Sequence, residues 1–235
     1  TLDTVPPILE ITSPANYAYT NQNPVSVIGT TEPNARVTIN GYAAPLVGTE
    51  FEALVELSEG ANTLTVIAVD QAGNINTLNY VVYLDTAVPD LTVYTPREEL
   101  WTKVARVLVS GQTESGATVT INGQNTNVIS TQFQLYVSLN EGANRIDVIA
   151  KDQAGNRRVM TRTVYLDTRL PDLVVTSPVD RSSLASRVVM VSGSVDWGSE
   201  VKVNGERVPV MDFVFTTTVA FTDDGQQTIE VTATD

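Results

Sequence analysis

Nine carboxylates recur at three positions of a repeating pattern, and they are the residues best suited to chemistry. The three positions are the start of each repeat, the loop after its second expected strand and the end of its sixth. The nine residues are Asp3, Asp85 and Asp167; Glu32, Glu114 and Asp196; and Asp70, Asp152 and Asp235. Carboxylate oxygens of this kind are suitable ligands for calcium, a hard cation.

The composition excludes most other chemistry. The 235 residues include no cysteine and no histidine, which excludes thiolate nucleophiles, disulfides, the usual zinc and copper sites and a Ser-His-Asp triad. A net charge of −13 with three lysines argues against nucleic-acid binding. Paired carboxylates are the one catalytic route left. Because an active site duplicated at every linker is implausible, we predict that the chain is not an enzyme.

An internal repeat organises the chain. Leu2-Asp3-Thr4, Leu84-Asp85-Thr86 and Leu166-Asp167-Thr168 are spaced by 82 residues, and 36 of 82 positions are identical between residues 3–84 and 85–166. Such self-similarity indicates duplicated domains. The predicted domains are 1–84, 85–166 and 167–235, and we call them domains 1, 2 and 3.

Each repeat has the pattern of short strands. Apolar residues alternate with polar ones, turn signals separate the runs, and no apolar period of 3.6 continues for ten residues. We therefore predict an all-β chain of three tandem immunoglobulin-like β-sandwich domains with about seven strands each. For domain 1 the expected strands are 8–12, 25–29, 36–40, 43–47, 50–57, 63–70 and 76–84.

The third repeat stops before its last turn and last strand, so we expect domain 3 to lack its last strand. Its sheet would then have an open edge, which invites the addition of another strand. Truncation is the interpretation we favour, and coverage by a neighbouring chain or by a different local fold is the alternative.

Three motifs carry a family resemblance. They are Asn40-Gly41, Glu59-Gly60-Ala61-Asn62 and Asp70-Gln71-Ala72-Gly73-Asn74, and each recurs in the second repeat. The chain resembles the bacterial Ig-like repeats of surface proteins, and most closely the glucodextranase domain-B-like group. The third repeat departs from the pattern, because Asp223-Asp224-Gly225-Gln226 replaces the second motif. The resemblance implies a stalk, an adhesin segment or a module attached to an enzyme.

The recurring carboxylates are expected to meet at the end of each domain that receives the preceding one. Carboxylates brought together there would repel one another unless a cation compensated them, so we predict a calcium ion at each junction. The resemblance to calcium-rigidified, cadherin-like arrays supports the same expectation. The alternative is that each acidic side chain caps a turn or is solvated.

Loop aromatics give a second, separate lead. Tyr19, Trp101 and Trp197 are candidates for stacking on a sugar ring. None of the loop aromatics recurs in all three repeats, which favours packing within the loops. Tyr83 and Tyr165 do recur, and cross-strand packing explains them.

The predicted function is a non-catalytic stalk or adhesin spacer in an extracellular protein, either secreted or at the cell surface. The alternative is an accessory polysaccharide-binding or spacer module of a secreted glycoside hydrolase. The expected partners are a protein or polysaccharide at the cell surface and neighbouring Ig-like repeats, with no nucleic acid. No membrane span is expected in this chain, because no stretch approaches roughly 18 uninterrupted apolar residues.

Overall fold

A computed structural model describes residues 2–235, and every regular element in these residues is a β-strand. The described residues contain no helix that could span a membrane. The chain divides into two compact units, Thr1–Asp167 and Thr168–Asp235. The first unit contains domains 1 and 2, and the second contains domain 3.

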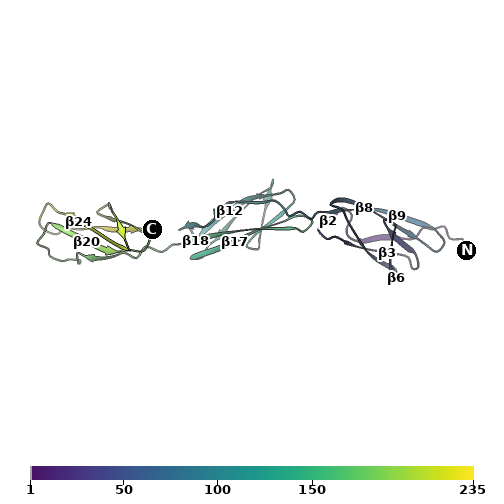
Figure 1. Cartoon of the computed structure of the whole chain (residues 1–235), viewed down its shortest axis with the longest axis horizontal. Coiled ribbons are helices and arrows are strands. Elements are labelled where there is room, and N and C mark those ends of the chain that lie inside the picture. The colour runs from purple at the N-terminus through teal and green to yellow at the C-terminus, as the bar shows by residue number, and fades with distance from the viewer. Residues whose placement is uncertain (1) are drawn as a thin grey trace. The chain divides into compact units, whose positions relative to one another are not determined.

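Residues 2–84 form nine strands in two facing sheets. The strands are β1 (Leu9–Ser13), β2 (Ala18–Thr20), β3 (Val25–Thr31), β4 (Arg36–Ile39), β5 (Tyr42–Ala44), β6 (Leu46–Val47), β7 (Glu50–Val55), β8 (Gly60–Val69) and β9 (Ile75–Leu84). One sheet has the order β1-β3-β7-β6 and the other the order β2-β9-β8-β4-β5. Figure 1 shows β8 and β9 side by side, as their ten-residue antiparallel pairing requires.

Residues 85–167 repeat this arrangement. The strands are β10 (Leu91–Thr95), β11 (Leu100–Thr102), β12 (Arg106–Thr113), β13 (Thr118–Ile121), β14 (Gln124–Thr126), β15 (Val128–Ile129), β16 (Gln132–Ser138), β17 (Gly142–Lys151) and β18 (Arg157–Leu166). The two sheets have the orders β10-β12-β16-β15 and β11-β18-β17-β13-β14.

Residues 168–235 form seven strands. They are β19 (Val174–Ser177), β20 (Val188–Ser194), β21 (Glu200–Val203), β22 (Glu206–Val208), β23 (Val210–Met211), β24 (Val214–Ala220) and β25 (Val231–Thr234). The sheets have the orders β19-β20-β24-β23 and β22-β21-β25, so these residues contain no counterpart of β9 or β18. The all-β, Ig-like prediction is confirmed, as is the missing last strand of domain 3.

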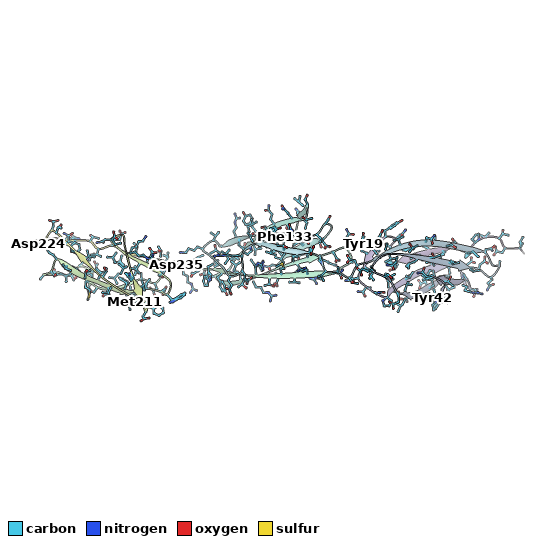
Figure 2. All side chains as sticks on the ribbon, turned by 45° about the horizontal axis from the view of Figure 1, so that its top comes forward. Tyr19, Tyr42, Phe133, Met211, Asp224 and Asp235 are labelled. Carbon is cyan, nitrogen blue, oxygen red and sulfur yellow. The ribbon has the colours of Figure 1, made fainter. Side chains whose placement is uncertain are left out.

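Each domain has its own apolar core, with a phenylalanine packed over a glycine. Phe133, labelled in Figure 2, is 3% exposed and lies opposite Gly111 across β12 and β16. A β-carbon at Gly111 would lie 2.6 Å from the ring of Phe133 and would also meet the carbonyl oxygen of Thr92. Only glycine lets the ring approach the backbone this closely.

Two details of the strand prediction were wrong. The short strand β2 was missed, because three residues pairing in parallel with β9 leave no recognisable alternation. The expected strand 43–47 is two strands, β5 and β6, which belong to opposite sheets. Pro45 lies between them, and the chain changes sheets at this residue.

Candidate functional site

The three predicted carboxylates of domain 1 line one open depression. Asp3 lies in the linker before β1, Glu32 directly follows β3, and Asp70 directly follows β8. The other lining residues are Pro33, Asn34, Gln71 and Ala72. The topology therefore brings the linker and the ends of two strands to one end of the domain.

The carboxylates surround this depression without converging on one point. Within residues 2–235, no group of three or more acidic side chains is arranged to hold a metal ion. The oxygen donors have the right chemistry for calcium, but the described residues do not form a ready-made site. Calcium binding at these positions stays a prediction.

The aspartate after each long strand closes a five-residue turn, which we call the Asp-Asn turn (residues 70–74 and 152–156). Oδ1 of Asp70 accepts the backbone N–H of Asn74 at 2.8 Å, and Oδ2 accepts its side-chain Nδ2 at 2.7 Å. Oδ1 of Asp152 accepts the backbone N–H groups of Gly155 and Asn156 at 2.7 and 2.8 Å, and Oδ2 accepts Nδ2 of Asn156 at 2.9 Å. The turn therefore satisfies both oxygens of its carboxylate.

The hydrogen bonds change the acidity of Asp70. Burial raises the pKa of its carboxyl, but the side chain of Asn74 and the backbone N–H groups of Asn74, Gly73 and Ala72 outweigh this effect. They hold the pKa of Asp70 below its ordinary value of 3.8. The carboxylate is therefore ionised at neutral pH, and these N–H donors compensate its charge.

The asparagine of each turn also holds the linker. Nδ2 of Asn74 donates to the carbonyl oxygen of Asp3 at 3.3 Å, and Nδ2 of Asn156 donates to that of Asp85 at 2.8 Å. The bond thus recurs 82 residues apart and joins the turn to the segment that enters the same domain.

The linker aspartates stabilise the linker itself. Oδ1 of Asp3 accepts the N–H of Val5 at 3.1 Å, and Oδ1 of Asp85 accepts the N–H of Ala87 at 3.0 Å. These are the local bonds of an Asx turn, in which an aspartate side chain accepts from the backbone two residues on. Asp167 directly follows β18 at the third such position.

Two carboxylates in the loop after the second expected strand also hold backbone near the linkers. Oε2 of Glu114 accepts the N–H of Asp90 at 3.2 Å, and Oδ2 of Asp196 accepts the N–H of Asp172 at 2.8 Å. Asp235 directly follows β25. In the described residues, at least six of the nine carboxylates accept a bond from a backbone N–H. For these six the structure supports the turn-capping alternative.

One residue that the sequence analysis missed reaches across the junction of domains 1 and 2. Asn21, directly after β2, donates from Nδ2 to Oδ1 of Asn156 at 3.1 Å. The side chain of Asn156 therefore contacts its own turn, the linker and domain 1. The recurrence of Asn74 and Asn156 in the Asp-Gln-Ala-Gly-Asn motif could have pointed to Asn156. Nothing in the sequence marks its partner, Asn21.

Two of the predicted aromatics occupy one repeat position and stack on a neighbour. Tyr19 lies 4.8 Å from Tyr83, and Trp101 lies 4.6 Å from Tyr165, measured between ring centroids. The packing interpretation of Tyr83 and Tyr165 is confirmed. Trp101 nevertheless stays 64% exposed, and Trp197, in the loop after β20, is 86% exposed.

The sequence family follows the same threefold division. The family described as glucodextranase, domain B, matches residues 7–86, 89–168 and 171–235. The chain belongs to this family. The resemblance predicted from the sequence motifs is thereby confirmed. Glucodextranase domain B repeats thus account for almost the whole chain, including the shorter third copy.

A curated relative shares this type of repeat. The chain is 30% identical over 198 residues to bacillopeptidase F of Bacillus subtilis (strain 168), and the match covers 79% of the chain. It covers 14% of bacillopeptidase F. The chain therefore corresponds to a small part of that protein.

Solved structures of tandem β-sandwich modules resemble the fold. The fibronectin(III)-like modules of Clostridium thermocellum CbhA match with a TM-score of 0.46 and 13% identity, covering 68% of this chain and 94% of theirs. A tetra-tandem repeat from the extending region of a large adhesion protein matches with a TM-score of 0.32 and 21% identity, covering 97% of this chain and 69% of that one. These likenesses concern the fold alone.

Proposed function

We propose that this chain is a non-catalytic spacer of a secreted or cell-surface protein, with domains 1 and 2 held together by direct hydrogen bonds at their linker. The observation that carries the proposal is the position of Asn156. Its side chain joins the Asp-Asn turn of domain 2 to the carbonyl of Asp85 and to Asn21 of domain 1. Such control of a junction suits a rigid spacer, whose linkers have little conformational freedom.

The linker has little freedom around these bonds. The backbone N–H of Asp85 donates to the carbonyl oxygen of Thr20 at 3.0 Å, and the side chain of Asp85 accepts from Ala87. Pro89 fixes its own φ two residues later. Each hydrogen bond contributes about 1 kcal/mol, so several of them within a few residues restrict the linker.

A modular role is consistent with the family. Bacillopeptidase F is a much longer protein, of which the matching segment is a small part. The partners we propose are neighbouring Ig-like repeats and a protein or polysaccharide at the cell surface. In this role the chain separates or presents other domains and performs no reaction.

Amide hydrogen exchange on the full chain tests the linker mechanism. Asn156→Ala is expected to speed exchange at Asp85 and Ala87 severalfold and to leave Val5 unchanged. Asn74→Ala is the matched control, because it removes the same side chain from the turn of domain 1 and should affect Val5 alone. Unchanged exchange at Asp85 and Ala87 in Asn156→Ala would contradict the proposed mechanism.

Calcium at the junctions is an additional prediction. The ion would bind at the recurring carboxylates, such as Asp85, Glu114 and Asp152, and would stabilise the folded junction by about 2.7 kcal/mol at one hundred times its Kd. A calorimetric titration should then show saturable heat, and a chelator should lower Tm. Absence of both effects would eliminate calcium and leave the hydrogen-bonded linker as the whole mechanism.

The exposed aromatic pairs support a second candidate, an accessory polysaccharide-binding module. Trp101 and Tyr165 form a stacked pair at the position of Tyr19 and Tyr83, and a ring with an open face can stack on a sugar. Pull-down with insoluble polysaccharides tests this function. Binding that is lost in Trp101→Ala and kept in Trp197→Ala would favour this candidate over a pure spacer.

A further inference from the structure

Charge is distributed unevenly between the two sheets of domains 1 and 2. The strands of the five-stranded sheets contain six of the nine basic residues of these domains, but only one of their 16 acidic residues. The whole chain has a net charge of −13. The five-stranded sheet therefore carries most of the positive charge of an acidic molecule, and it is the side of each domain that attracts an anion.

The outward positions of this sheet in domain 2 include two exposed basic residues side by side. Val148 and Ala150 of β17 are fully buried, so the residues that alternate with them, including Lys151, point away from the core. Lys151 is the Cα partner of Arg157 in β18, and both residues are exposed. Two cationic side chains therefore lie next to each other on the outer face of the sheet.

The acidic residues nearest to these cations already have other partners. Asp147, the one acidic residue in the strands of this sheet, accepts Nε of Arg145 at 2.9 Å. Asp152, next to Lys151 in sequence, uses both carboxylate oxygens within its own turn. Within residues 2–235, neither Lys151 nor Arg157 forms an ion pair. Their charges are therefore available to an anion from solution.

An aromatic pair lies at the other end of the same face. Trp101, in the edge strand β11, is the partner of Tyr165 in β18, and their rings are stacked. Tyr165 and Arg157 are eight residues apart in one strand, so about 26 Å separates the rings from the two cations. We call this outward side of the five-stranded sheet the basic face, and in domain 2 it includes Trp101, Arg145, Lys151, Arg157 and Tyr165.

Domain 1 repeats the basic face with less charge. Tyr19, labelled in Figure 2, stacks on Tyr83. Arg36 is the only basic residue of this domain, and it is paired with Val69, the counterpart of Lys151. The strands of this sheet contain no acidic residue. The strands of the other sheet contain three, namely Glu10, Glu50 and Glu52.

We propose that the basic face binds an anionic polysaccharide, with sugar rings stacked on the aromatic pair and carboxylates paired with the outward basic side chains. The inference rests on the second candidate function and names the chemical class of its ligand. Exposed ion pairs are individually weak, so separated contacts on an open face suit a polymer that makes several of them at once. A polymer also repeats its rings and charges, as domains 1 and 2 repeat the face.

Calorimetric titration of the full chain with a hexamer of galacturonic acid tests the inference. Saturable binding is expected, and it should weaken as salt screens the charges. The double variant Lys151→Gln with Arg157→Gln is expected to bind at least tenfold more weakly. Arg106→Gln is the matched control, because Arg106 is an exposed basic residue of the other sheet, and it should bind as wild type does. The same hexamer should shift the NMR signals of β11, β17 and β18.

Two further probes separate the sugar ring from the charge. The methyl ester of the hexamer keeps the rings and loses the charges, whereas a hexamer of glutamate keeps the charges and has no ring. Both are expected to bind at least tenfold more weakly than the galacturonate hexamer. Equal binding of the glutamate hexamer would indicate an acidic peptide as the partner and would overturn the inference.

Three other results would also overturn it. They are the absence of saturable binding, equal binding of the methyl ester, and undiminished binding by the double variant. Neutral polysaccharides that bind wild type and the double variant alike would leave the second candidate function intact while removing its anionic ligand. Amide exchange at Asp85 and Ala87 should not change in the double variant, so failure of this inference is distinguishable from failure of the hydrogen-bonded linker.

Discussion

At the scale of residues, at least six of the recurring carboxylates accept hydrogen bonds from backbone N–H groups. Asp70 and Asp152 close their turns, and Asp85 and Glu114 accept N–H groups of the linker region. The 82-residue repeat predicted their positions, because side-chain identity is visible in a sequence. Their partners could not be predicted, since every residue offers a backbone N–H and only the folded chain selects one.

The lowered pKa of Asp70 predicts an acid-dependent stability of domain 1. A carboxyl whose pKa is lower in the folded state stabilises that state above its unfolded value. This contribution is therefore present above 3.8 and is lost as pH falls through the folded pKa. Thermal unfolding of domain 1, followed by its NMR signals between pH 7 and pH 2, should show a larger loss of Tm in wild type than in Asp70→Asn.

The same comparison has an internal control in domain 2. Hydrogen bonds from Thr161 and Arg145 lower the pKa of Asp147 despite an opposing effect of burial, so domain 2 should keep its acid sensitivity in Asp70→Asn. Parallel Tm curves for domain 1 in wild type and variant would show that Asp70 contributes nothing to the pH dependence.

At the scale of elements, the Asn-Gly pairs form the turn that this residue pair favours. Asn40 and Gly41 have φ values of 51° and 84°, and Asn122 and Gly123 have 48° and 80°, as a type I′ hairpin requires. The structure adds a second role, because Oδ1 of Asn122 accepts the N–H of Asp147 in β17 at 2.8 Å. The turn therefore joins its own hairpin to the neighbouring strand.

Two substitutions at Asn122 separate these roles. Asn122→Gly keeps the left-handed backbone and loses the side-chain bond, so it should cost about 1 kcal/mol of unfolding free energy. Asn122→Ala loses the same bond and also the tolerance of asparagine for the left-handed region, which adds about 1 kcal/mol. Denaturant unfolding in a Trp197→Phe background, where Trp101 reports domain 2, measures both values. Equal losses of unfolding free energy in the two variants would contradict the assignment of two separate roles to Asn122.

Other elements were beyond prediction for physical reasons. β2 and β11 have three residues each, too few to show a period, and their parallel pairing with the last strand depends on contacts more than 60 residues apart in sequence. The change of sheet between β14 and β15 occurs at Asn127, which carries no local signal. Tertiary packing determines these features.

At the scale of the molecule, the first two repeats are sandwiches whose entry segments are held by the same Asp-Asn turn. The predicted domain boundaries stay predictions, and the family matches and the three separate cores follow the same threefold order. We assign a function to one contact that the described residues show at a single junction. The junction of domains 1 and 2 carries the Asn21–Asn156 contact.

The most direct test of the spacer account is ¹⁵N relaxation of the full chain, which yields a rotational correlation time for each domain. We predict that domains 1 and 2 share one correlation time in wild type and in Asn74→Ala, and that the two values separate in Asn156→Ala. Independent tumbling of domains 1 and 2 in wild type, or a shared correlation time in Asn156→Ala, would contradict the claim that this asparagine holds the junction.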